Sequence, residues 1–371
     1  MVETTLSSEL TSTEERYLSA WMEKTSRSFA LLIPWLEAPL NNYLAIAYLI
    51  CRMVDNIEDC SQSSIWKQQR FAEAAELLRQ PDKAALILNS WQQETWIGLT
   101  ANEQQFMTVS GGLMLWQIYA MLPETAQGII HQWVLQMITG MNGLDGPEQS
   151  PYFVERQGVQ VLAQVTDYNR YCYIVAGTVG HICTELVVDQ YRLSAQVGQG
   201  LLATCEACGR GLQKTNIIKD FADDLGRGIA YLPAQWLQEV NYAPLLLAGS
   251  PLAWSHKILK DALSELAGAV DYLHLLPYDV AGYRMAGLVS LLAAYQTLLL
   301  AARKRADLFT INHEVKISRP TMVQCIHEAE KLVRDNEGIR AYGRHIAQTI
   351  DDLFTDQPGL PLCDEDAFSP G

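Results

Sequence analysis

The sequence predicts an all-α protein, a single-domain helical bundle that encloses a large apolar cavity. Apolar residues recur at three- and four-residue spacing along most of the 371-residue chain, which is the period of an amphipathic helix. Short clusters of Pro, Gly, Asn and Asp separate these stretches, as expected of turns between helices. Strand-like alternation is confined to YLPAQWL, from Tyr231, and TINHEVKIS, from Thr310.

The periodicity predicts helices in ten stretches of the chain. They cover residues 13–33, 42–58, 64–78, 102–122, 124–140, 160–191, 195–224, 251–274, 282–305 and 319–352. In TSTEE, Thr11 with Glu14, or Ser12 with Glu15, fits a capping box at the start of the first helix. Pro123 suits the start of the helix at 124–140, because the first turn of a helix tolerates proline.

These helices are expected to form one domain at residues 13–352. We expect a disordered N-terminus at 1–12 and a flexible acidic tail at 353–371. The segment NGLDGPEQSPYFVERQG, residues 142–158, is interpreted as a loop inside this domain. No Gly/Ser/Pro-rich linker and no fixed-period repeat divides the chain.

The composition limits the classes of partner. Hydrophobic residues make up 49% of the chain and the formal net charge is −15. No basic stripe is present to neutralise phosphates, which argues against a nucleic-acid partner. Phosphorylated ligands remain open, because acidic residues can hold them through a divalent cation.

Cysteine usage and hydropathy predict a cytoplasmic location. The eight cysteines lie mostly in apolar helical patterns, as is typical of reduced, buried thiols. Cys205 and Cys208 form a CxxC pair without a second Cys/His pair at zinc-site spacing, so helix packing is the better interpretation.

The N-terminus lacks the apolar run of a secretory signal. The apolar part of GLVSLLAAYQTLLLAARKR, from Gly287, is shorter than the ~20 residues that span a bilayer. We therefore expect a buried core helix there and no transmembrane anchor.

The segment CRMVDNIEDC ends an otherwise apolar helix with three carboxylates, Asp55, Glu58 and Asp59. Like charges at helical spacing repel one another, and burying them unpaired costs more. A helical projection places Tyr48 and Arg52 with these acids within about 120° of one another. A solvated surface face explains such a stripe when it stands alone.

A second segment, GLQKTNIIKDFADDLGRG, carries a similar stripe. Its Gln213, Asn216, Asp220 and Asp224 fall within an arc of about 80° on a helix. Two stripes on apolar helices, each with acids four residues apart, favour a Mg²⁺ site over two solvated faces. Mg²⁺ takes one or two carboxylates together with waters and substrate phosphates. Two clusters facing a cavity would hold a diphosphate through metal ions that polarise it as a leaving group.

An apolar helical cavity with diphosphate bound at its mouth suits a long hydrocarbon substrate. Ionising an allylic diphosphate there would create a carbocation, which a water-poor, aromatic-lined pocket can shelter. The residues alone thus suggest an isoprenyl diphosphate enzyme.

Four motifs resemble the squalene/phytoene synthase family, the head-to-head condensing enzymes, and within it the squalene synthases. SRSFALLIP, from Ser26, is similar to the N-terminal substrate motif of the family. AYLICRMVDNIEDC resembles its first aspartate-rich motif, YCYIVAGTVG, from Tyr171, its central tyrosine motif, and QKTNIIKDFADD its second aspartate-rich motif. The resemblance covers roughly residues 26–319, and the order and spacing of the motifs make it specific.

The resemblance implies an isoprenoid-synthase-type fold and a two-step reaction. Two molecules of farnesyl diphosphate would condense head to head to presqualene diphosphate. A reductive rearrangement with NADPH would then give squalene and release diphosphate, a step of sterol or hopanoid biosynthesis.

Carried over position by position, the resemblance also implies three sets of site residues. Magnesium would be bound by Asp55, Glu58, Asp59, Asp220 and Asp224. Substrate contacts are implied for Arg27, Ser28, Phe29, Tyr48, Arg52, Gln213, Asn216 and Arg227. Apolar lining is implied for Met137, Met141, Gly177 and Leu212, where packing and pocket roles look alike in a sequence.

By the same resemblance, Tyr171 would be the general acid/base of the condensation, in a catalytic set with Arg52 and Tyr48. A free tyrosine has a pKa near 10, so it needs neighbouring cations or metal-bound diphosphate to act. Without the surrounding motif, a core tyrosine with a satisfied hydroxyl would be the better interpretation.

No GxGxxG follows a strand, so no Rossmann site for a dinucleotide is predicted. Squalene synthases instead bind NADPH through residues near the second acidic motif and in a VKIRK-like segment. The matching residues here are Asn216 and Lys219, and Lys316 with Arg319. Ser318 stands where the family pattern has an arginine, and a solvated loop lysine explains Lys316 equally well.

Two alternatives stay open. AGYRMAGLVSLLAAY departs from the FCAIPQ-like sequence of eukaryotic squalene synthases and leans toward bacterial relatives. Such relatives end at presqualene diphosphate, hydroxysqualene, dehydrosqualene or phytoene without NADPH. A non-catalytic binding protein would be expected to lose acids from one motif, yet all five carboxylates are present. Because squalene is insoluble in water, we expect transient contact with a membrane surface for product release.

Overall fold

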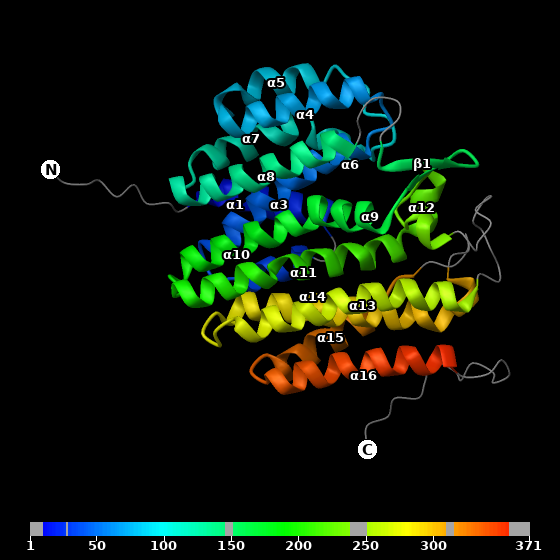
Figure 1. Ribbon diagram of the computed structural model, residues 1–371. Coiled ribbons are helices and arrows are strands. Elements are labelled where there is room, and N and C mark those ends of the chain that lie inside the picture. Colours follow the sequence, from blue (N-terminus) through cyan, green and yellow to red (C-terminus); the bar gives the residue numbers. More distant parts are fainter. Residues whose placement is uncertain (1–9, 27–28, 145–150, 238–250, 309–314, 356–371) are drawn as a thin grey trace.

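The computed structural model describes residues 10–26, 29–144, 151–237, 251–308 and 315–355 (Figure 1). Residues 1–9 and 356–371 lie outside it. Most of the N-terminus predicted to be disordered, 1–12, and most of the tail predicted to be flexible, 353–371, are therefore outside the described residues. Arg27 and Ser28, predicted to contact substrate, also lie outside the described residues.

The described residues fold mostly into helices, which confirms the all-α class. The first half contains α1 (Ser12–Thr25), α2 (Phe29–Leu32), α3 (Leu40–Asp59), α4 (Ser64–Arg79), α5 (Ala84–Trp91), α6 (Ala101–Phe106), α7 (Val109–Ala120) and α8 (Glu124–Leu144). The second half contains α9 (Val165–Cys172), α10 (Thr178–Gln190), α11 (Ala195–Lys219), α12 (Phe221–Gly226), α13 (Leu252–Leu275), α14 (Ala281–Lys304), α15 (Arg319–Leu332) and α16 (Asn336–Thr355).

Short helical turns of other types complete the fold. Four are 3₁₀ turns, η1 (Ile33–Trp35), η2 (Pro81–Lys83), η4 (Ala234–Leu237) and η5 (Arg305–Asp307). The fifth, η3 (Tyr173–Gly177), is a π-helical segment that joins α9 to α10.

The helices lie side by side in a stack (Figure 1). α4 and α5 are at one side of the stack, α15 and α16 are at the opposite side, and α3, α10 and α11 lie between them (Figure 1). α11 packs against α10, α13, α14 and η3, while α3 packs against α1, α4, α8 and α10. The two helices that carry the acidic motifs are therefore both interior elements of the stack.

Some predicted helix starts are confirmed. Thr11 caps α1, donating its backbone N–H to Glu14 Oε2 over 2.7 Å and accepting from the Glu14 N–H, so the capping box is present. α8 begins at Glu124, directly after Pro123. Each of these signals is local, which is why the sequence reveals it.

Several predicted helices are interrupted by turns. The helix predicted at 13–33 ends at Thr25, and Thr108 caps the start of α7 within the stretch 102–122. The helix predicted at 319–352 divides between α15 and α16, and α5 is an additional helix. The helix predicted at 195–224 is kinked at Asp220, which changes the second acidic motif as described below.

A small sheet lies where a loop and the start of a helix are predicted. β1 (Phe153–Arg156) and β2 (Val159–Leu162) pair antiparallel, so part of the predicted loop at 142–158 is a hairpin and the start of the helix predicted at 160–191 is a strand. The turn is made by Gln157 and Gly158, with φ of 54° and 83°, as a tight two-residue hairpin requires. β3 (Ile229–Ala230) then adds in parallel to β2.

α14 confirms the buried core helix predicted from the apolar stretch at Gly287. Its Leu288, Leu292 and Leu298 are fully buried. Among the described residues, α14 and the helical stretch 165–190 are long and apolar enough to cross a membrane. Two thirds of the apolar window of α14 and half of that of 165–190 are buried inside the fold, which suits core helices.

Glycines let α11 cross the preceding helical stretch at backbone distance. A Cβ added to Gly180 of α10 would lie 2.5 Å from the carbonyl oxygen of Cys205. A Cβ added to Gly209 of α11 would lie 2.0 Å from that of Ala176. No side chain fits at either place, so these glycines fix how closely α11 lies against η3 and α10.

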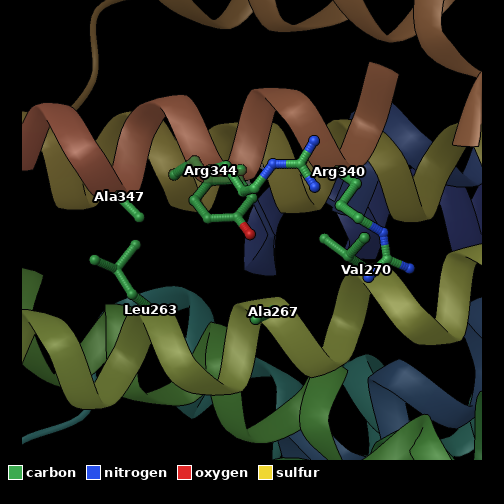
Figure 2. Close-up of a pocket in the computed structure, with 8 residues that line it drawn as sticks. Leu263, Ala267, Val270, Arg340, Arg344 and Ala347 are labelled. Carbon is green, nitrogen blue, oxygen red and sulfur yellow. The ribbon is translucent and has the colours of Figure 1, made fainter. Parts of the chain in front are cut away.

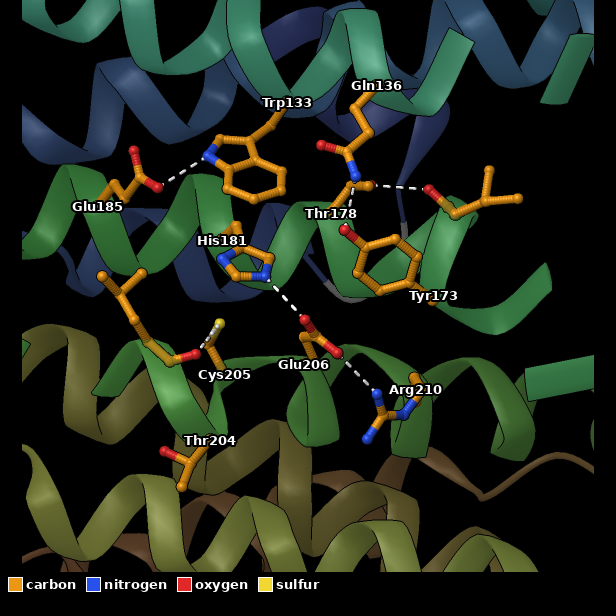
Figure 3. Close-up of polar contacts among 12 residues, drawn as sticks. Trp133, Gln136, Tyr173, Thr178, His181, Glu185, Thr204, Cys205, Glu206 and Arg210 are labelled. Atoms are coloured by element: carbon orange, nitrogen blue, oxygen red, sulfur yellow. Dashed lines mark hydrogen bonds and ion pairs between the residues drawn. The ribbon is translucent and has the colours of Figure 1, made fainter. Parts of the chain in front are cut away.

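Polar contacts hold the same helices together (Figure 3). His181 stacks on Trp133 of α8 at 3.9 Å between ring centroids, and its Nε2 lies 3.0 Å from Glu206 Oε1. Arg210 donates to Glu206 Oε2 and to Glu265 of α13, at 2.8 and 3.0 Å. These contacts are partly exposed, with the Arg210 side chain 26% and the Glu206 side chain 36% exposed, and together they link α8, α10, α11 and α13.

Candidate active site

The first acidic motif lies on one continuous helix. α3 runs unbroken to Asp59 with its apolar side buried. The side chains of Asp55 and Asp59 are 27% and 29% exposed. One turn before Asp55, Arg52 places Nη1 3.7 Å from Asp55 Oδ2. α3 therefore presents a cation and its carboxylates at a half-buried surface.

The second acidic motif lies on a kinked backbone. α11 ends at Lys219, and Asp220 has φ −96° and ψ 8° before α12 begins. The helical hydrogen bonds persist across the kink, from the Asp220 N–H to the Asn216 carbonyl and from the Asp224 N–H to the Asp220 carbonyl. The Asp220 side chain remains 44% exposed, whereas that of Asp224 is 7% exposed. The single straight stripe predicted from Gln213 to Asp224 is thus wrong in detail, because the helix bends within it.

The guanidinium of Arg227 joins the two motifs. Its Nη1 donates to Asp59 Oδ1 over 2.8 Å, and its Nη2 donates to Asp224 Oδ1 over 2.5 Å. These two contacts bring the end of α3 and the start of α12 to the same place, although the two segments are far apart in the chain. Arg227 is 45% exposed, so its outer face remains open to solvent.

The small sheet positions the segment that follows Arg227. Gly228, with φ of 80°, turns the chain out of α12 into β3. β3 pairs with β2 through Gln160↔Ile229 and Val161↔Ala230. This pairing fixes the next residue, Tyr231, beside the tyrosine motif of α9.

Tyr171 stacks on Tyr231. Their ring centroids are 4.2 Å apart with an interplanar angle of 16°, and both side chains are buried. The Tyr231 hydroxyl donates to Glu58 Oε1 of the first acidic motif over 3.4 Å. Tyr171 therefore lies near the acidic motifs and is connected to them through a second tyrosine.

Tyr231 is a candidate site residue that no motif in the sequence indicates. It follows Asp224 by seven positions, inside the YLPAQWL stretch that attracted notice only for its strand-like alternation. Its placement depends on the pairing of β3 with β2, which no local pattern reveals.

The backbone directly after Tyr171 is unusual. η3 forms a π-helical turn at the point where α9 becomes α10. Gly177, at the end of η3, has no room for a side chain, because an added Cβ would lie 2.7 Å from the Tyr173 ring. π-helical turns recur at functional sites, since they redirect side chains within an otherwise regular helix.

Burial controls the protonation of the site. It raises the pKa of Asp55 to about 6 against the lowering effect of Arg52, and that of Asp224 to about 6 against the lowering effect of Arg227. Burial, with the nearby Glu58 carboxylate, also raises the pKa of Tyr171 well above its usual value. Tyr171 is therefore a neutral proton donor at neutral pH, and the two aspartates are short of compensating positive charge.

These acids suit a divalent cation that is completed by its ligand. Within the described part of the chain, no three His, Cys, Asp or Glu side chains converge tightly enough to hold a metal by themselves. Mg²⁺ does not require this, because it keeps waters and takes phosphate oxygens beside one or two carboxylates. The raised pKa values of Asp55 and Asp224 indicate that added positive charge would stabilise the site.

Arg52 has an unused hydrogen-bond donor that could bind an anion. Its Nε is buried without a hydrogen-bond partner, and its guanidinium carbon lies 6.0 Å from the centre of the Tyr48 ring. The Tyr48 hydroxyl donates to the Thr25 carbonyl over 3.0 Å, and its ring contacts Phe29 at 5.2 Å. Arg52, Tyr48 and Phe29 thus form one contact chain next to the first acidic motif.

The predicted apolar lining comes from elements that meet at η3. Met137 and Met141 are both buried on α8, and Leu212 is half-buried on α11. α8 and α11 both pack against η3, which contributes Gly177. On the polar side of α11, Gln213 is half-buried and Asn216 is exposed.

The predicted cofactor residues occupy exposed or half-exposed positions. Lys219 lies 3.1 Å from Asp220 Oδ2 and donates to Asn216 Oδ1 over 3.2 Å. Lys316 and Arg319 are exposed near the start of α15. Ser318 is the N-cap of α15, since its hydroxyl accepts from the Thr321 N–H. A capping role explains serine at this position, where the family pattern has arginine.

Two cavities of the described residues lie away from the acidic motifs. One, of about 230 Å³, lies between α13, α14 and α16. The other, of about 320 Å³, is lined by residues of α4, α7 and α8, among them Tyr119 and His131. The large apolar cavity at the acidic motifs stays a prediction.

The helical fold and the joined acidic motifs define the class of an isoprenoid-synthase-type protein. The squalene/phytoene synthase family matches residues 22–321. The chain belongs to this family.

The chain is similar to squalene synthases and to phytoene synthases. A squalene synthase of Candida albicans is 30% identical over 265 residues, which are 68% of this chain and 54% of that protein. A bifunctional lycopene cyclase/phytoene synthase of Phaeosphaeria nodorum is 24% identical over 269 residues, or 70% of this chain and 42% of that one. The chain spans about half the length of these relatives.

Solved structures agree on the fold. The complex of TcSQS with the ligand BPH1237 superimposes with a TM-score of 0.72 at 20% identity, covering 92% of this chain and 96% of that one. A dehydrosqualene synthase in complex with ligand superimposes with a TM-score of 0.60 at 17% identity, covering 87% and 97%.

Proposed function

We propose that this protein is a squalene synthase. It condenses two molecules of farnesyl diphosphate head to head to presqualene diphosphate, and reduces this with NADPH to squalene with release of diphosphate. The observation that carries the proposal is the junction at Arg227, where Asp59 and Asp224 from the two acidic motifs bind one guanidinium. A cationic group that already holds both motifs marks the position for a diphosphate and its counter-ions.

Magnesium is the proposed metal, held by Asp55, Glu58, Asp59, Asp220 and Asp224. When bound, it would neutralise the diphosphate and make it a better leaving group. The chain itself supplies Arg52 and Arg227 as further cationic contacts to phosphate oxygens. Gln213, Asn216 and the N-terminal set Arg27, Ser28, Phe29 and Tyr48 are proposed to orient the substrate.

Tyr171 is proposed to move the proton that is lost as the cyclopropane ring closes. Its hydroxyl is protonated in the free protein, because burial and Glu58 raise its pKa. Positive charge brought in with the substrate complex would lower that pKa toward the range in which Tyr171 can exchange a proton. Met137, Met141, Gly177 and Leu212 are proposed to exclude water from the cationic intermediates.

NADPH is the proposed reductant for the second step. Asn216, Lys219, Lys316 and Arg319 would contact it, with the two lysines and the arginine supplying charge for its phosphates. We propose a cytoplasmic enzyme that contacts a membrane surface transiently to release squalene.

A second candidate is a related synthase that stops at presqualene diphosphate, hydroxysqualene, dehydrosqualene or phytoene without NADPH. Two observations favour it: Ser318 is used as a helix cap in place of the family's arginine, and phytoene synthases are among the relatives. Incubation of the full chain with farnesyl diphosphate and Mg²⁺, with and without NADPH, separates the two by gas chromatography. Squalene formed only with NADPH is expected, and identical products in both reactions would contradict the first proposal.

A non-catalytic binding role is tested by the same preparation. Mg²⁺ with a non-hydrolysable farnesyl diphosphate analogue should raise the thermal midpoint, because the ligand binds only the folded state. Stabilisation without any turnover of farnesyl diphosphate would favour a binding protein.

A further inference from the structure

A cavity remote from the acidic motifs has the features of a ligand site. It lies between α13, α14 and α16 and has a volume of about 230 Å³ (Figure 2). Its lining consists of Leu263, Ala267, Val270, Tyr295, Arg340, Gly343, Arg344 and Ala347. One side is thus aliphatic, while a phenol and two guanidinium groups provide the polar side.

Tyr295 directs an unused hydroxyl into this cavity. Its side chain is only 3% exposed, and its hydroxyl has no hydrogen-bond partner among the described residues. Burial raises its pKa to about 12, so the hydroxyl is a neutral donor. Because Tyr295 lines the cavity, its hydroxyl is available to donate a hydrogen bond to an acceptor on a ligand.

Gly343 keeps the space around this hydroxyl open. A Cβ at this position would lie 2.7 Å from the Tyr295 hydroxyl oxygen, closer than side-chain atoms approach one another. The glycine lies on α16, one position before Arg344, so the opening and the nearest cation come from the same helical turn.

The two arginines differ in how they are used. Arg340 donates to Asp271 Oδ1 over 3.2 Å and contacts His274 Nδ1 at 2.8 Å. Arg344 is exposed and has no ion pair or hydrogen bond with any other described residue. Arg344 is therefore the cation available at the mouth of the cavity.

We propose that this cavity binds a small amphiphilic anion. Its carboxylate or phosphate head would accept hydrogen bonds from Arg344 and from the Tyr295 hydroxyl. Its short hydrocarbon tail would pack on Leu263, Ala267 and Val270. The volume is below the ~300–1,000 Å³ of common drug-sized pockets, so the ligand is smaller than a farnesyl diphosphate. The site is separate from the proposed reaction, because its lining residues belong to neither acidic motif.

Calorimetric titration of the full chain without Mg²⁺ or farnesyl diphosphate tests this site. Octanoate and octyl phosphate, each below its aggregation concentration, distinguish the two head groups, and octanol is the uncharged control. Saturable one-to-one binding of at least one anion is expected, with octanol at least about tenfold weaker because it lacks the charge-assisted contact. No binding of either anion, or equal binding of octanol, would overturn the proposal.

Variants locate the binding. Arg344→Gln should weaken the anion about tenfold, and Tyr295→Phe about three- to tenfold, because each loses one hydrogen-bonded contact. Arg334→Gln, which removes an exposed arginine outside the cavity, is the matched control and should bind normally. Ala267→Leu should fill the tail position and abolish binding while the thermal midpoint is kept, because Ala267 is exposed.

Unchanged affinity in Arg344→Gln together with Ala267→Leu would show that the anion binds elsewhere and overturn the assignment. Because no turnover is measured, failure here leaves the proposed synthase activity untouched.

Discussion

The first acidic motif lies on one unbroken helix, whereas the second lies across a kink between two helices. Asp55 and Asp59 take their positions from α3, which is buried along its apolar side. Asp220 and Asp224 are instead separated by a bend that leaves one exposed and the other buried. The first motif needs only local helical geometry, while the second also needs Arg227 and the pairing of β3 with β2.

This difference indicates which half of the site can adjust. α3 is held by packing on several sides, so its carboxylates are a fixed platform. α12 is a short helix tied to that platform by a partly exposed ionic contact, which is worth little energy in water. We infer that the second motif is the part that adapts when ligand binds.

The largest expected effect is loss of turnover when either motif loses a carboxylate. Asp55→Asn and Asp220→Asn should each lower kcat on the order of 10²–10³-fold, as removal of one charge-stabilising group does in other enzymes. Asp223→Asn is the matched control, because Asp223 is an exposed neighbour in the same segment. Product formation from farnesyl diphosphate measures the effect, and full activity of either variant would remove that residue from the site.

A backbone clash should damage the second motif through α11. Gly209→Ala should lower the free energy of unfolding by about 1–3 kcal/mol, because the added methyl group meets the Ala176 carbonyl. Gly128→Ala on α8 is the control, since nothing lies within 4 Å of its added Cβ. There the alanine should stabilise by about 0.5–1 kcal/mol. Urea unfolding measures both, and equal effects at the two positions would contradict the close crossing.

The contact between Tyr231 and the first acidic motif can be tested by removing one oxygen atom. Tyr231→Phe keeps the stack on Tyr171 but removes the hydroxyl that reaches Glu58. Condensation should slow about tenfold, the effect of losing one hydrogen bond to a charged group, with little change in KM. Tyr231→Leu should be slower still because it also removes the stack. An unchanged rate in Tyr231→Phe would confine the role of Tyr231 to packing.

Arg227→Gln should separate the binding of metal from the binding of diphosphate. Stability should fall by about 1–3 kcal/mol, because the Asp224 side chain is only 7% exposed and loses its cationic partner. Mg²⁺ alone should bind more tightly, since Arg227 no longer competes for Asp59 and Asp224, while diphosphate should bind more weakly. Arg156→Gln, an exposed arginine of β1, is the control. Parallel changes for both ligands would show that Arg227 does not lie between them.

The smallest effect concerns the pH dependence of the metal-free protein. The pKa values of Asp55 and Asp224 are about 6 in the folded protein, against 3.8 for an ordinary aspartate. The folded state therefore binds more protons than the unfolded state between these values, so stability is greatest below about pH 4 as far as these groups are concerned and is lost as pH rises through 6. Lowering the pH from 7 to 5 should raise their contribution to the thermal midpoint, and Asp55→Asn should reduce this rise. A midpoint that moves identically in Asp55→Asn and the parent protein would contradict the assignment.

Much of the fold follows from local patterns. The long apolar helices, the Thr11 capping box and the buried character of α14 each depend on residues a few positions apart. The first acidic motif was predictable for the same reason, because α3 continues without interruption to Asp59.

The rest depends on contacts between distant segments. Ile217, Ile218 and Phe221 continue the apolar period straight through Asp220, so the sequence shows no sign of the kink. Gln157 and Gly158 make the hairpin turn, but they are not the Asn-Gly or Asp-Gly pair by which such a turn is recognised in a sequence. Tyr231 reaches Tyr171 only because β3 pairs with β2.

A π turn accommodates one residue more than an α turn, so the apolar period of α9 and that of α10 differ in phase by about 100° across η3. The rod formed by α9, η3 and α10 can therefore present Tyr171 to Tyr231 and Gly180 to α11 at the same time. Deleting a single residue between 173 and 177 would restore a regular helix. Tyr171 could then no longer face Tyr231 while Gly180 faces α11. For this rod, chain length within one turn matters as much as the identity of its residues.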